Sequence, residues 1–318
     1  MSEIPAVSVV IPLYNKGPYI TRALNSVLAQ TFQDFEVTVV DDGSTDDGAA
    51  VVRGFDDPRI RLIQQENRGV SAARNQGIEA ARAELVAFLD ADDEWLPGFL
   101  ETIMRLRKKF PEAGAYAASY YIQYYSHIRE VNIQYLPSRP WEGIIQRYFQ
   151  VAAKSEPLTS SSICIPKTTF SKLGSFVVGK WWGEDTEMWG RIALHYYIAF
   201  SRESGAVYHY EVTNRANERV KVEIDHPFMK TGYDCIKNNG KNMPPSDLND
   251  LQEYIEILKL KVAGRALKSG KPDFAREVIS ECKTKHQRRE RYVMYLISYL
   301  PAFIYQIVRT IKVKIYSL

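Results

Sequence analysis

Residues 84–110 read "ELVAFLDADDEWLPGFLETIMRLRKKF" and contain one complete unit of strand, loop and helix. The continuous apolar run at residues 85–89 predicts a buried strand, and the later apolar positions predict an amphipathic helix. Between them lie four acids in the five positions 90–94. These carboxylates, placed directly after a buried strand, are the first candidates for a functional site.

Three similar units precede this one. They are "AVSVVIPLYN" before "GPYITRALNSVLAQ", "FEVTVV" before "DDGSTDDGAAVVRGF", and "IRLIQQ" before "GVSAARNQGIEAARA". Strands with little internal alternation, joined by amphipathic helices, predict an α/β fold whose parallel sheet is covered on both faces. Ligands of such sheets bind outside the carboxyl ends of the strands. The polar clusters "PLYN", "DDGSTDD", "ENRG" and "DADDE" all fall there.

The regular alternation stops beyond residue 113. The segment "AYAASYYIQYYSHIREVNIQYL" predicts antiparallel or mixed strands. Further predicted elements are a helix near 140–152, a strand "SSSICI", a helix from Asp185 to His195 and a strand "GAVYHYEV", with a mainly helical region at 219–285. We therefore expect a catalytic domain at 1–212, made of halves 1–112 and 113–212, and a helical C-terminal extension at 213–318.

Composition excludes several classes of protein. The chain has 318 residues, of which 45% are hydrophobic and 25% charged, as in ordinary soluble globular proteins. Its three cysteines are far apart and form no CxxC pair, so we expect neither a disulfide framework nor a zinc site. The first 15 residues resemble neither a secretory signal nor a membrane anchor, and we expect a cytoplasmic protein.

Two aspartates end the second predicted strand, in "VVDDGSTDD". Asp41 and Asp42 are suited to accept hydrogen bonds from a nucleotide. A plain strand-to-helix turn is the alternative, since Gly43 permits a tight turn and Ser44 or Thr45 could cap the next helix.

The acids after the fourth strand favour a metal site. Asp90, Asp92 and Asp93 repel one another unless a cation compensates them, and a hard divalent cation prefers oxygen ligands. A metal beside a second acidic cluster suits a nucleoside diphosphate. Arg68 and Arg74, in "ENRGVSAARNQG", could reach its phosphate or base, or could be solvated at the surface.

The segments "VSVVIPLYN", "VVDDGSTDD", "NRGVSAARNQG", "FLDADD" and "GEDTEMWGRIA" resemble, in order and spacing, those of family 2 glycosyltransferases, over about residues 5–212. The resemblance implies a GT-A fold, with a Rossmann-like nucleotide-binding half and a mixed sheet. It also implies inverting transfer of a sugar from a nucleotide donor, commonly UDP-linked. Mn²⁺ or Mg²⁺ would be held by the DxD motif, which here is Asp90-Ala91-Asp92.

The resemblance also assigns the donor side. It makes Asp92 the main metal ligand, Asp90 a contact to ribose or metal, and Asp42 a contact to the base. The backbone around Pro12 and Tyr14 would line the nucleoside pocket. His209, in "VYHYEV", would complete the metal shell or contact the diphosphate, or would be structural.

The segment "KWWGEDTEMWGRIALHYY" would supply the acceptor side. Inverting transfer needs a base that takes the proton of the acceptor hydroxyl. The resemblance favours Asp185, with Glu184 as second choice, although helix capping alone would explain both acids. Arg191 matches the family's usual arginine, which orients the acidic loop or approaches phosphate. Trp181 and Trp182 could stack on an acceptor sugar or pack in the core.

The C-terminal tail is basic and apolar. Residues 283–318 hold eight Lys or Arg and one acid, and the uncharged stretch 292–308 is flanked by "KTKHQRRER" and "RTIKVK". A spanning helix needs about 20 apolar residues, and Pro301 would kink this one. We expect one or two helices in an anionic membrane interface. Burial in the core or in a homo-oligomer interface, or a true membrane span, are the alternatives.

Together these features predict a metal-dependent hexosyl- or N-acetylhexosaminyltransferase. It would lie on the inner face of the cell membrane and extend a saccharide on a lipid-linked acceptor for a surface polysaccharide. A sugar nucleotidyltransferase is less well supported because no Gly-rich phosphate loop follows the first strand, and no GxGxxG supports a dinucleotide oxidoreductase. A silent carbohydrate-binding scaffold is opposed by the intact acidic motifs. Nucleic acid is not an expected partner, given the long apolar run of the tail.

Overall fold

Four strand-helix units form the first half of the molecule, as the apolar runs predict. A computed structural model describes residues 4–210 and 225–300 of the chain. The strands are β1 Val7–Leu13, β2 Phe35–Asp42, β3 Ile60–Gln65, β4 Leu85–Phe88, β5 Glu94–Trp95, β6 Ala115–Tyr124, β7 His127–Glu130, β8 Glu142–Ile144, β9 Ile163–Pro166 and β10 Ile198–His209. The helices are α1 Gly17–Leu28, α2 Gly48–Arg53, α3 Val70–Ala80, α4 Phe99–Lys109, α5 Tyr148–Ala152, α6 Lys167–Leu173, α7 Glu184–His195, α8 Pro227–Asn239, α9 Pro245–Lys268, α10 Pro272–Glu281 and α11 Arg288–Ile297.

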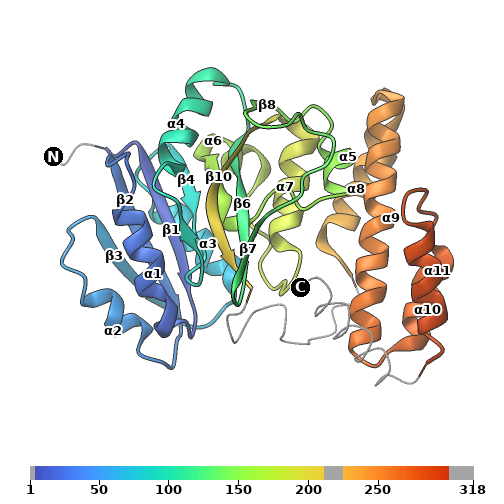
Figure 1. The fold of residues 1–318 in the computed structure, drawn as a ribbon, viewed down its shortest axis with the longest axis horizontal. Coiled ribbons are helices and arrows are strands. Elements are labelled where there is room, and N and C mark those ends of the chain that lie inside the picture. Colours follow the sequence, from blue (N-terminus) through green and yellow to red (C-terminus); the bar gives the residue numbers. More distant parts are fainter. Residues whose placement is uncertain (1–3, 211–224, 301–318) are drawn as a thin grey trace.

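The first four strands are parallel, in the order β3-β2-β1-β4. Every residue of β1 and β2 is buried, so both faces of this half of the sheet are covered. The helix α3 packs on β1 and β2, and α1 contacts α2 (Figure 1). The carboxyl ends of β1, β2 and β4 therefore meet at one edge of the sheet, where the polar clusters of the sequence fall.

The second half of the sheet is mixed, as predicted. Strand β9 pairs antiparallel with both β4 and β6, and β10 pairs parallel with β6 and antiparallel with β5 and β8. Among the described residues the full order is β3-β2-β1-β4-β9-β6-β10-β5, with β7 on β6 and β8 on β10. This pairing turns β10, which ends at His209, towards the same edge as the acidic loop after β4.

Two local expectations differ from the structure. The helix expected near 140–152 is the short strand β8 followed by the short helix α5. In "SSSICI" only Ile163–Pro166 is strand, because Ser160–Ser162 form a 3-10 turn. Residues 94–95, which precede the predicted helix, form β5 against β10. The strands β5 and β8 depend on pairing with β10, which is distant in sequence, and local periodicity does not report such pairing.

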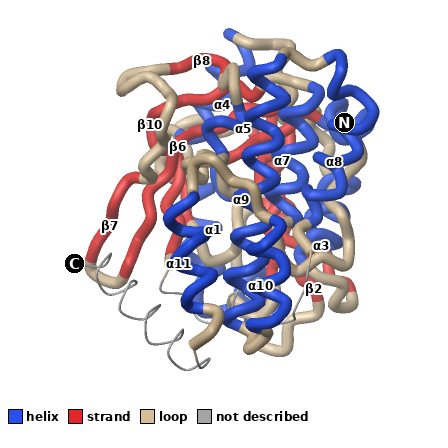
Figure 2. The backbone as a smooth tube through the Cα atoms, turned by 90° about the vertical axis from the view of Figure 1, so that its right-hand side faces the viewer, coloured by secondary structure: helices blue, strands red, loops and turns tan. Residues whose placement is uncertain are grey.

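The helical extension shares the main core of the catalytic domain. Phe228 of α8 is fully buried and stacks on Phe149 of α5, and Tyr254 of α9 contacts both rings. Further along, Ala263 and Ala266 of α9 form a smaller core with α10. Figure 1 shows α9, α10 and α11 side by side opposite β3, and these helices face the viewer in Figure 2. The domain boundary expected at residue 212 therefore does not separate two cores.

The predicted membrane segment 292–308 is only partly within the described residues. Helix α11 ends at Ile297, and residues 301–318, with Pro301 and the second basic cluster, lie outside them. Within residues 4–210 and 225–300, no helix combines the length and the apolarity needed to cross a bilayer.

Helix α7 packs so closely on α8 that a glycine is needed at their contact. A Cβ atom at Gly190 would lie 2.2 Å from the ring of Phe228. We expect Gly190→Ala to lower the free energy of unfolding by about 1–3 kcal/mol through overpacking, measured by urea denaturation. The control is Gly240→Ala, where the nearest atoms lie 3.6 Å from the added Cβ and little change is expected. Equal stability of the two variants would contradict the close packing of α7 on α8.

Candidate active site

The loops after β1 and β2 are joined by hydrogen bonds from main-chain N–H groups to side-chain oxygens. Asn15, whose φ of 51° lies in the left-handed region that asparagine tolerates, donates its N–H to Ser44 Oγ at 3.0 Å. Thr45 returns a bond from its N–H to Asn15 Oδ1 at 2.7 Å, and the Gly17 N–H donates to Asp46 at 2.8 Å. These bonds hold the carboxyl ends of β1 and β2 in a fixed arrangement beside a cavity that Pro12 and Tyr14 line.

Asp42 is buried and organises the loop before α3. Its carboxylate accepts hydrogen bonds from Gln65 Nε2 at 2.6 Å and from the N–H groups of Arg68 and Gly69 at 2.9 and 2.8 Å. Asp42 lines the cavity, as expected for a donor contact. Arg68 joins this network through its backbone, and its exposed side chain is not among the residues that line the cavity.

Arg74 joins the two acidic motifs. Its guanidinium lies 2.9 Å from Asp90 and 3.1 Å from Glu184, and its side chain is only 3% exposed. Burial opposes the charge, yet the two carboxylates together raise the pKa of Arg74 above its usual range. The two strongest sequence motifs of the chain are therefore held together by one buried cation.

The acids of the loop after β4 have different environments. Burial raises the pKa of Asp90, against the effect of Arg74. Burial also raises the pKa of Asp93 well above its usual range, with further effects from Asp92 and Asp90. Asp93 is 1% exposed and accepts hydrogen bonds from Ser161 Oγ at 2.5 Å and the His209 N–H at 3.0 Å. Asp93 supports the loop from beneath.

Asp92 faces the cavity and has a lysine as its partner. Lys16 Nζ lies 2.7 Å from Asp92 Oδ2, and both residues line the cavity. Arg22 donates to the main-chain carbonyl of Asp92, which fixes the backbone of the loop. Sequence reasoning missed Lys16. The available signal was its position directly after "PLYN", at the carboxyl end of β1.

The structure does not assemble the predicted three-residue metal shell. The His209 ring lies 3.0 Å from Glu94. Asp90 and Asp92 are paired with Arg74 and Lys16 respectively. Among the described residues there is no group of three or more His, Cys, Asp or Glu placed to hold a metal ion. His209 does line the cavity, but its partner belongs to β5.

The second motif begins α7 after a turn that requires glycine. Gly183 has a φ of 75°, and a Cβ there would lie 2.5 Å from His226 Nε2. Glu184 follows and is buried. Desolvation, together with the adjacent Asp185 and against the effect of Arg74, raises the pKa of Glu184 to about 7. Asp185 is half-buried, lines the cavity, and accepts the Thr186 N–H on Oδ1 at 2.6 Å.

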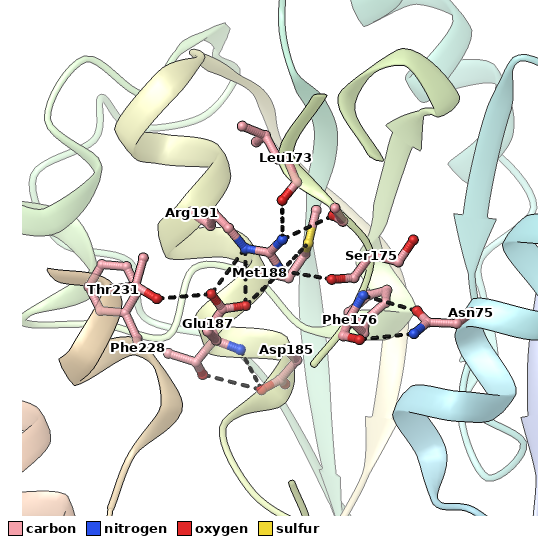
Figure 3. A network of polar contacts seen from close by, with 12 residues as sticks. Asn75, Leu173, Ser175, Phe176, Asp185, Glu187, Met188, Arg191, Phe228 and Thr231 are labelled. Atoms are coloured by element: carbon pink, nitrogen blue, oxygen red, sulfur yellow. Dashed lines mark hydrogen bonds and ion pairs between the residues drawn. The ribbon is translucent and has the colours of Figure 1, made fainter. Parts of the chain in front are cut away.

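Arg191 lies behind this motif rather than in the cavity. Its guanidinium lies 2.7 Å from Glu187 and donates to the carbonyls of Leu173, Gly174 and Ser175 at 2.5, 3.0 and 2.9 Å (Figure 3). Because Arg191 is not among the lining residues, the geometry supports an orienting role and not an approach to phosphate. The adjacent loop is tied to α3 by two bonds between Asn75 and Phe176.

All these motifs open onto one cavity of about 480 Å³, a volume typical of a small-molecule site. On the side away from β1 its wall is aromatic, with Tyr120, Tyr124, Tyr148, Tyr208, Trp181 and Trp182 among its residues. Trp182 has His226 edge-on at 4.8 Å and the guanidinium of Arg265 4.5 Å from its ring. Tyr254 and Lys261 of α9 complete this wall. The helical extension is therefore part of the cavity.

Comparison with known proteins agrees with the fold and the motifs. The family model described as glycosyl transferase family 2 matches residues 8–172, more than half of the chain, and the chain belongs to that family. The uncharacterized glycosyltransferase YibD of Escherichia coli K12 is 41% identical over 108 residues, which are 33% of this chain and 31% of that protein. Chondroitin synthase of Escherichia coli is 34% identical over 167 residues, which are 52% of this chain and 22% of that protein. The matched segments thus span about a third or less of these relatives.

Two solved structures share the fold over nearly the whole chain. Staphylococcus aureus TarS 1-349, in complex with UDP-GlcNAc, superposes with a TM-score of 0.63 at 18% identity and covers 96% of this chain and 91% of its own. The mannosyltransferase PcManGT of Pyrobaculum calidifontis, in complex with GDP-Man and Mn²⁺, gives a TM-score of 0.57 at 20% identity and covers 98% and 87%. The fold is therefore GT-A, as the sequence motifs indicate.

The buried Glu184 makes stability depend on pH in a defined direction. Its folded pKa of about 7 lies above the ordinary value of 4.5, so the folded chain holds a proton that the unfolded chain releases between these values. The free energy of unfolding should fall as pH rises from 4.5 to 7, by at most about 1.4 kcal/mol per pH unit from this group.

Glu184→Gln should weaken this fall, measured by urea denaturation at several pH values between 4 and 8. Glu66→Gln, at an exposed position, should keep the wild-type slope. If the stability difference between wild type and Glu184→Gln were constant over this range, the raised pKa of Glu184 would be wrong.

Proposed function

We propose that the protein transfers a sugar from a nucleotide-sugar donor, with UDP as nucleotide, to a hydroxyl of a saccharide acceptor with inversion at the anomeric carbon. The observation that supports this most strongly is the Arg74 bridge. It brings Asp90 of the DxD motif and Glu184 of the second acidic motif to one cavity, with an apolar and aromatic wall on the side away from β1. A donor and an acceptor can therefore meet between the two motifs.

The donor side consists of the loops after β1, β2 and β4. Pro12 and Tyr14 are proposed to line the nucleoside pocket, and Asp42, which already holds the loop of Gly69, to present that loop to the base. TarS is described with UDP-GlcNAc and PcManGT with GDP-Man, so the fold accepts either base. The choice of UDP follows the resemblance to the family.

The oxygen ligands at this edge suit Mg²⁺ or Mn²⁺. The Asp92 carboxylate opens to the cavity, and hard divalent cations are often held by one or two carboxylates together with substrate phosphate oxygens. A site of that kind does not need a cage made only of protein groups. Asp92 is proposed as the main ligand, with Asp90 beside it, and the bound cation would neutralise charge on the leaving diphosphate.

Asp185 is proposed as the base. It lines the cavity, and within the described part of the chain its carboxylate accepts hydrogen bonds on Oδ1 alone, from the N–H and hydroxyl of Thr186. Glu184, by contrast, is buried against Arg74. Asp185 takes the proton of the acceptor hydroxyl while that oxygen bonds to the anomeric carbon. The bond from this carbon to the diphosphate oxygen breaks, and the nucleoside diphosphate leaves with the electron pair. Arg191 and His226 hold the start of α7 in place for this step.

The aromatic wall is proposed to bind the acceptor saccharide. Tyr120 and Tyr148 are largely buried at its base, and Trp181 and Trp182 are half-buried near the motif of Asp185. Flat aromatic faces can pack against the apolar faces of sugar rings while their polar tips remain hydrogen-bonded. Lys261 of α9 lies at the same wall, 2.8 Å from Glu156.

The outer surface of α11 is proposed to bind an anionic membrane. Tyr292, Leu296 and Tyr299 are 63%, 50% and 60% exposed, next to the exposed Arg288 and Arg289. Met294, on the other side of the helix, packs on the smaller core. Exposed aromatic and aliphatic side chains beside arginines suit the interface of a bilayer. A lipid-linked acceptor for surface polysaccharide synthesis, at the inner face of the cell membrane, follows from this attachment.

Removal of each motif acid should affect a different step. Asp185→Asn should lower kcat by about 10²- to 10⁴-fold and leave the affinity for the nucleotide-sugar within a few-fold of wild type. Asp92→Asn should abolish the increase in donor affinity that Mn²⁺ produces. Donor affinity is measured by calorimetry with UDP-sugars, and turnover by release of the nucleoside diphosphate.

Asp56→Asn, at an exposed acid away from the cavity, is the matched control and should match wild type in both assays. Full turnover by Asp185→Asn would remove that residue as the base, and an unchanged response to Mn²⁺ in Asp92→Asn would remove the metal assignment.

The α11 surface can be tested with variants at its exposed side chains. Replacement of Tyr292, Leu296 and Tyr299 by serine should lower co-sedimentation of the full chain with phosphatidylglycerol vesicles several-fold, and so should Arg288→Glu with Arg289→Glu. Tyr197→Ser, at a residue 60% exposed elsewhere on the surface, should bind as wild type does. Undiminished binding by both groups of variants would show that α11 is not the attachment surface.

A further inference from the structure

The three residues expected to hold the metal each have a partner from this chain. Asp90 is paired with Arg74 at 2.9 Å, Asp92 with Lys16 at 2.7 Å, and the His209 ring with Glu94 at 3.0 Å. A divalent cation that binds at these residues must therefore displace at least one partner. Which partner is displaced depends on how strongly each is held.

Arg74 is poorly suited to leave. It is 3% exposed and bonded to two carboxylates, and its departure would leave the buried Glu184 and the partly exposed Asp90 without their counter-charge. Loss of one partner from a buried ion pair is strongly destabilising. The guanidinium fork is also fixed in direction. The bridge between the two acidic motifs is therefore expected to persist when ligands bind.

Lys16 is well suited to leave. Its side chain and that of Asp92 are 11% and 19% exposed, and both line the cavity. The ammonium is a single charge on a flexible stem. The backbone of Lys16 is held separately, because its carbonyl accepts the N–H groups of Tyr19 and Ile20 at 2.9 and 3.0 Å. The ammonium can move within the cavity while the start of α1 stays in place.

We propose that Lys16 holds Asp92 in the free enzyme, yields it to the divalent cation, and then pairs with the diphosphate of the donor. The inference rests on the proposed function for the identity of the donor. It makes Lys16 a substrate-binding residue and couples the entry of the metal to that of the nucleotide.

Charge balance supports this exchange. The ionised Asp92 and a diphosphate diester together carry more negative charge than one divalent cation neutralises, and the Lys16 ammonium supplies the remainder. Without a nucleotide, Lys16 and the cation compete for one carboxylate. With a nucleotide, the ammonium has a second anion to pair with, so the competition is relieved and the two ligands strengthen each other's binding.

The test compares Mn²⁺ binding by wild type and by Lys16→Met, with and without UDP, using the electron paramagnetic resonance signal of free Mn²⁺. Without UDP, Lys16→Met should bind Mn²⁺ about tenfold more tightly, because Asp92 loses its competing partner. The affinity for UDP in the presence of saturating Mn²⁺ should fall about tenfold. A purely structural lysine would give no increase in metal affinity.

Two further variants make the result specific. Lys16→Arg keeps the charge and should bind Mn²⁺ no more tightly than wild type. Lys108→Met, at an exposed lysine of α4 that does not line the cavity, should behave as wild type. Adding Asp92→Asn to Lys16→Met should abolish the gain in metal affinity. Thermal unfolding shows whether each variant is folded. If Lys16→Met does not fold, Mn²⁺ binding by Lys16→Arg still tests the inference.

Unchanged or weaker Mn²⁺ binding by folded Lys16→Met, or tighter binding by Lys16→Arg, would overturn the inference. This outcome differs from failure of the proposed function, which would appear in wild type as no binding of nucleotide-sugars and no transfer. If wild type bound Mn²⁺ and UDP without mutual enhancement, the coupling would be refuted even though the enzyme transferred sugar.

Discussion

The buried ion pairs of Arg74 are the interaction on which the site depends. A guanidinium that is 3% exposed contacts Asp90, at the end of one β-α unit, and Glu184, at the start of α7. Burial raises the pKa of each acid, and the positive charge of Arg74 opposes this rise. Arg74 thus links the loop after β4 to the start of α7, and both of these segments line the same cavity.

The helical extension belongs to this arrangement and is not an appendage. Phe228 and Tyr254 join the main core through Phe149, and His226 fills the space that a side chain at Gly183 would occupy. The turn before Asp185 is therefore shaped from both sides, by Arg74 and Asn75 within the α/β half and by α8 from the extension. Tyr254 and Lys261 of α9 line the cavity together with the loops of the α/β half.

The four acids after β4 show how tertiary contacts divide one motif. The buried Asp93 supports the loop, Asp90 pairs with Arg74, and Asp92 faces the cavity with Lys16. Glu94 contacts the His209 ring while a third of its side chain remains exposed. Sequence reasoning identified the cluster, and its choice of Asp92 as the main metal ligand stays a prediction. It could not find Lys16 or Glu94 as partners, because those contacts depend on how α1 and β5 lie beside the loop.

The sequence by itself determined the four strand-helix units, the mixed sheet after residue 113 and the family. Apolar periodicity and closely spaced motifs are local features, so they can be recognised without knowledge of any tertiary contact. The sequence also placed Asp42, Asp90 and Asp92 at the carboxyl ends of strands, which meet at one edge of a parallel sheet, and the resemblance to the family added Asp185. All four residues line one cavity. Only the tertiary structure decided that Arg74 bridges two motifs, that Arg68 and Arg191 lie outside the cavity, and that α9 completes it. The physical reason is that the charge state and orientation of a side chain depend on desolvation and on partners brought close by folding, and these are not encoded in the spacing of neighbours along the chain.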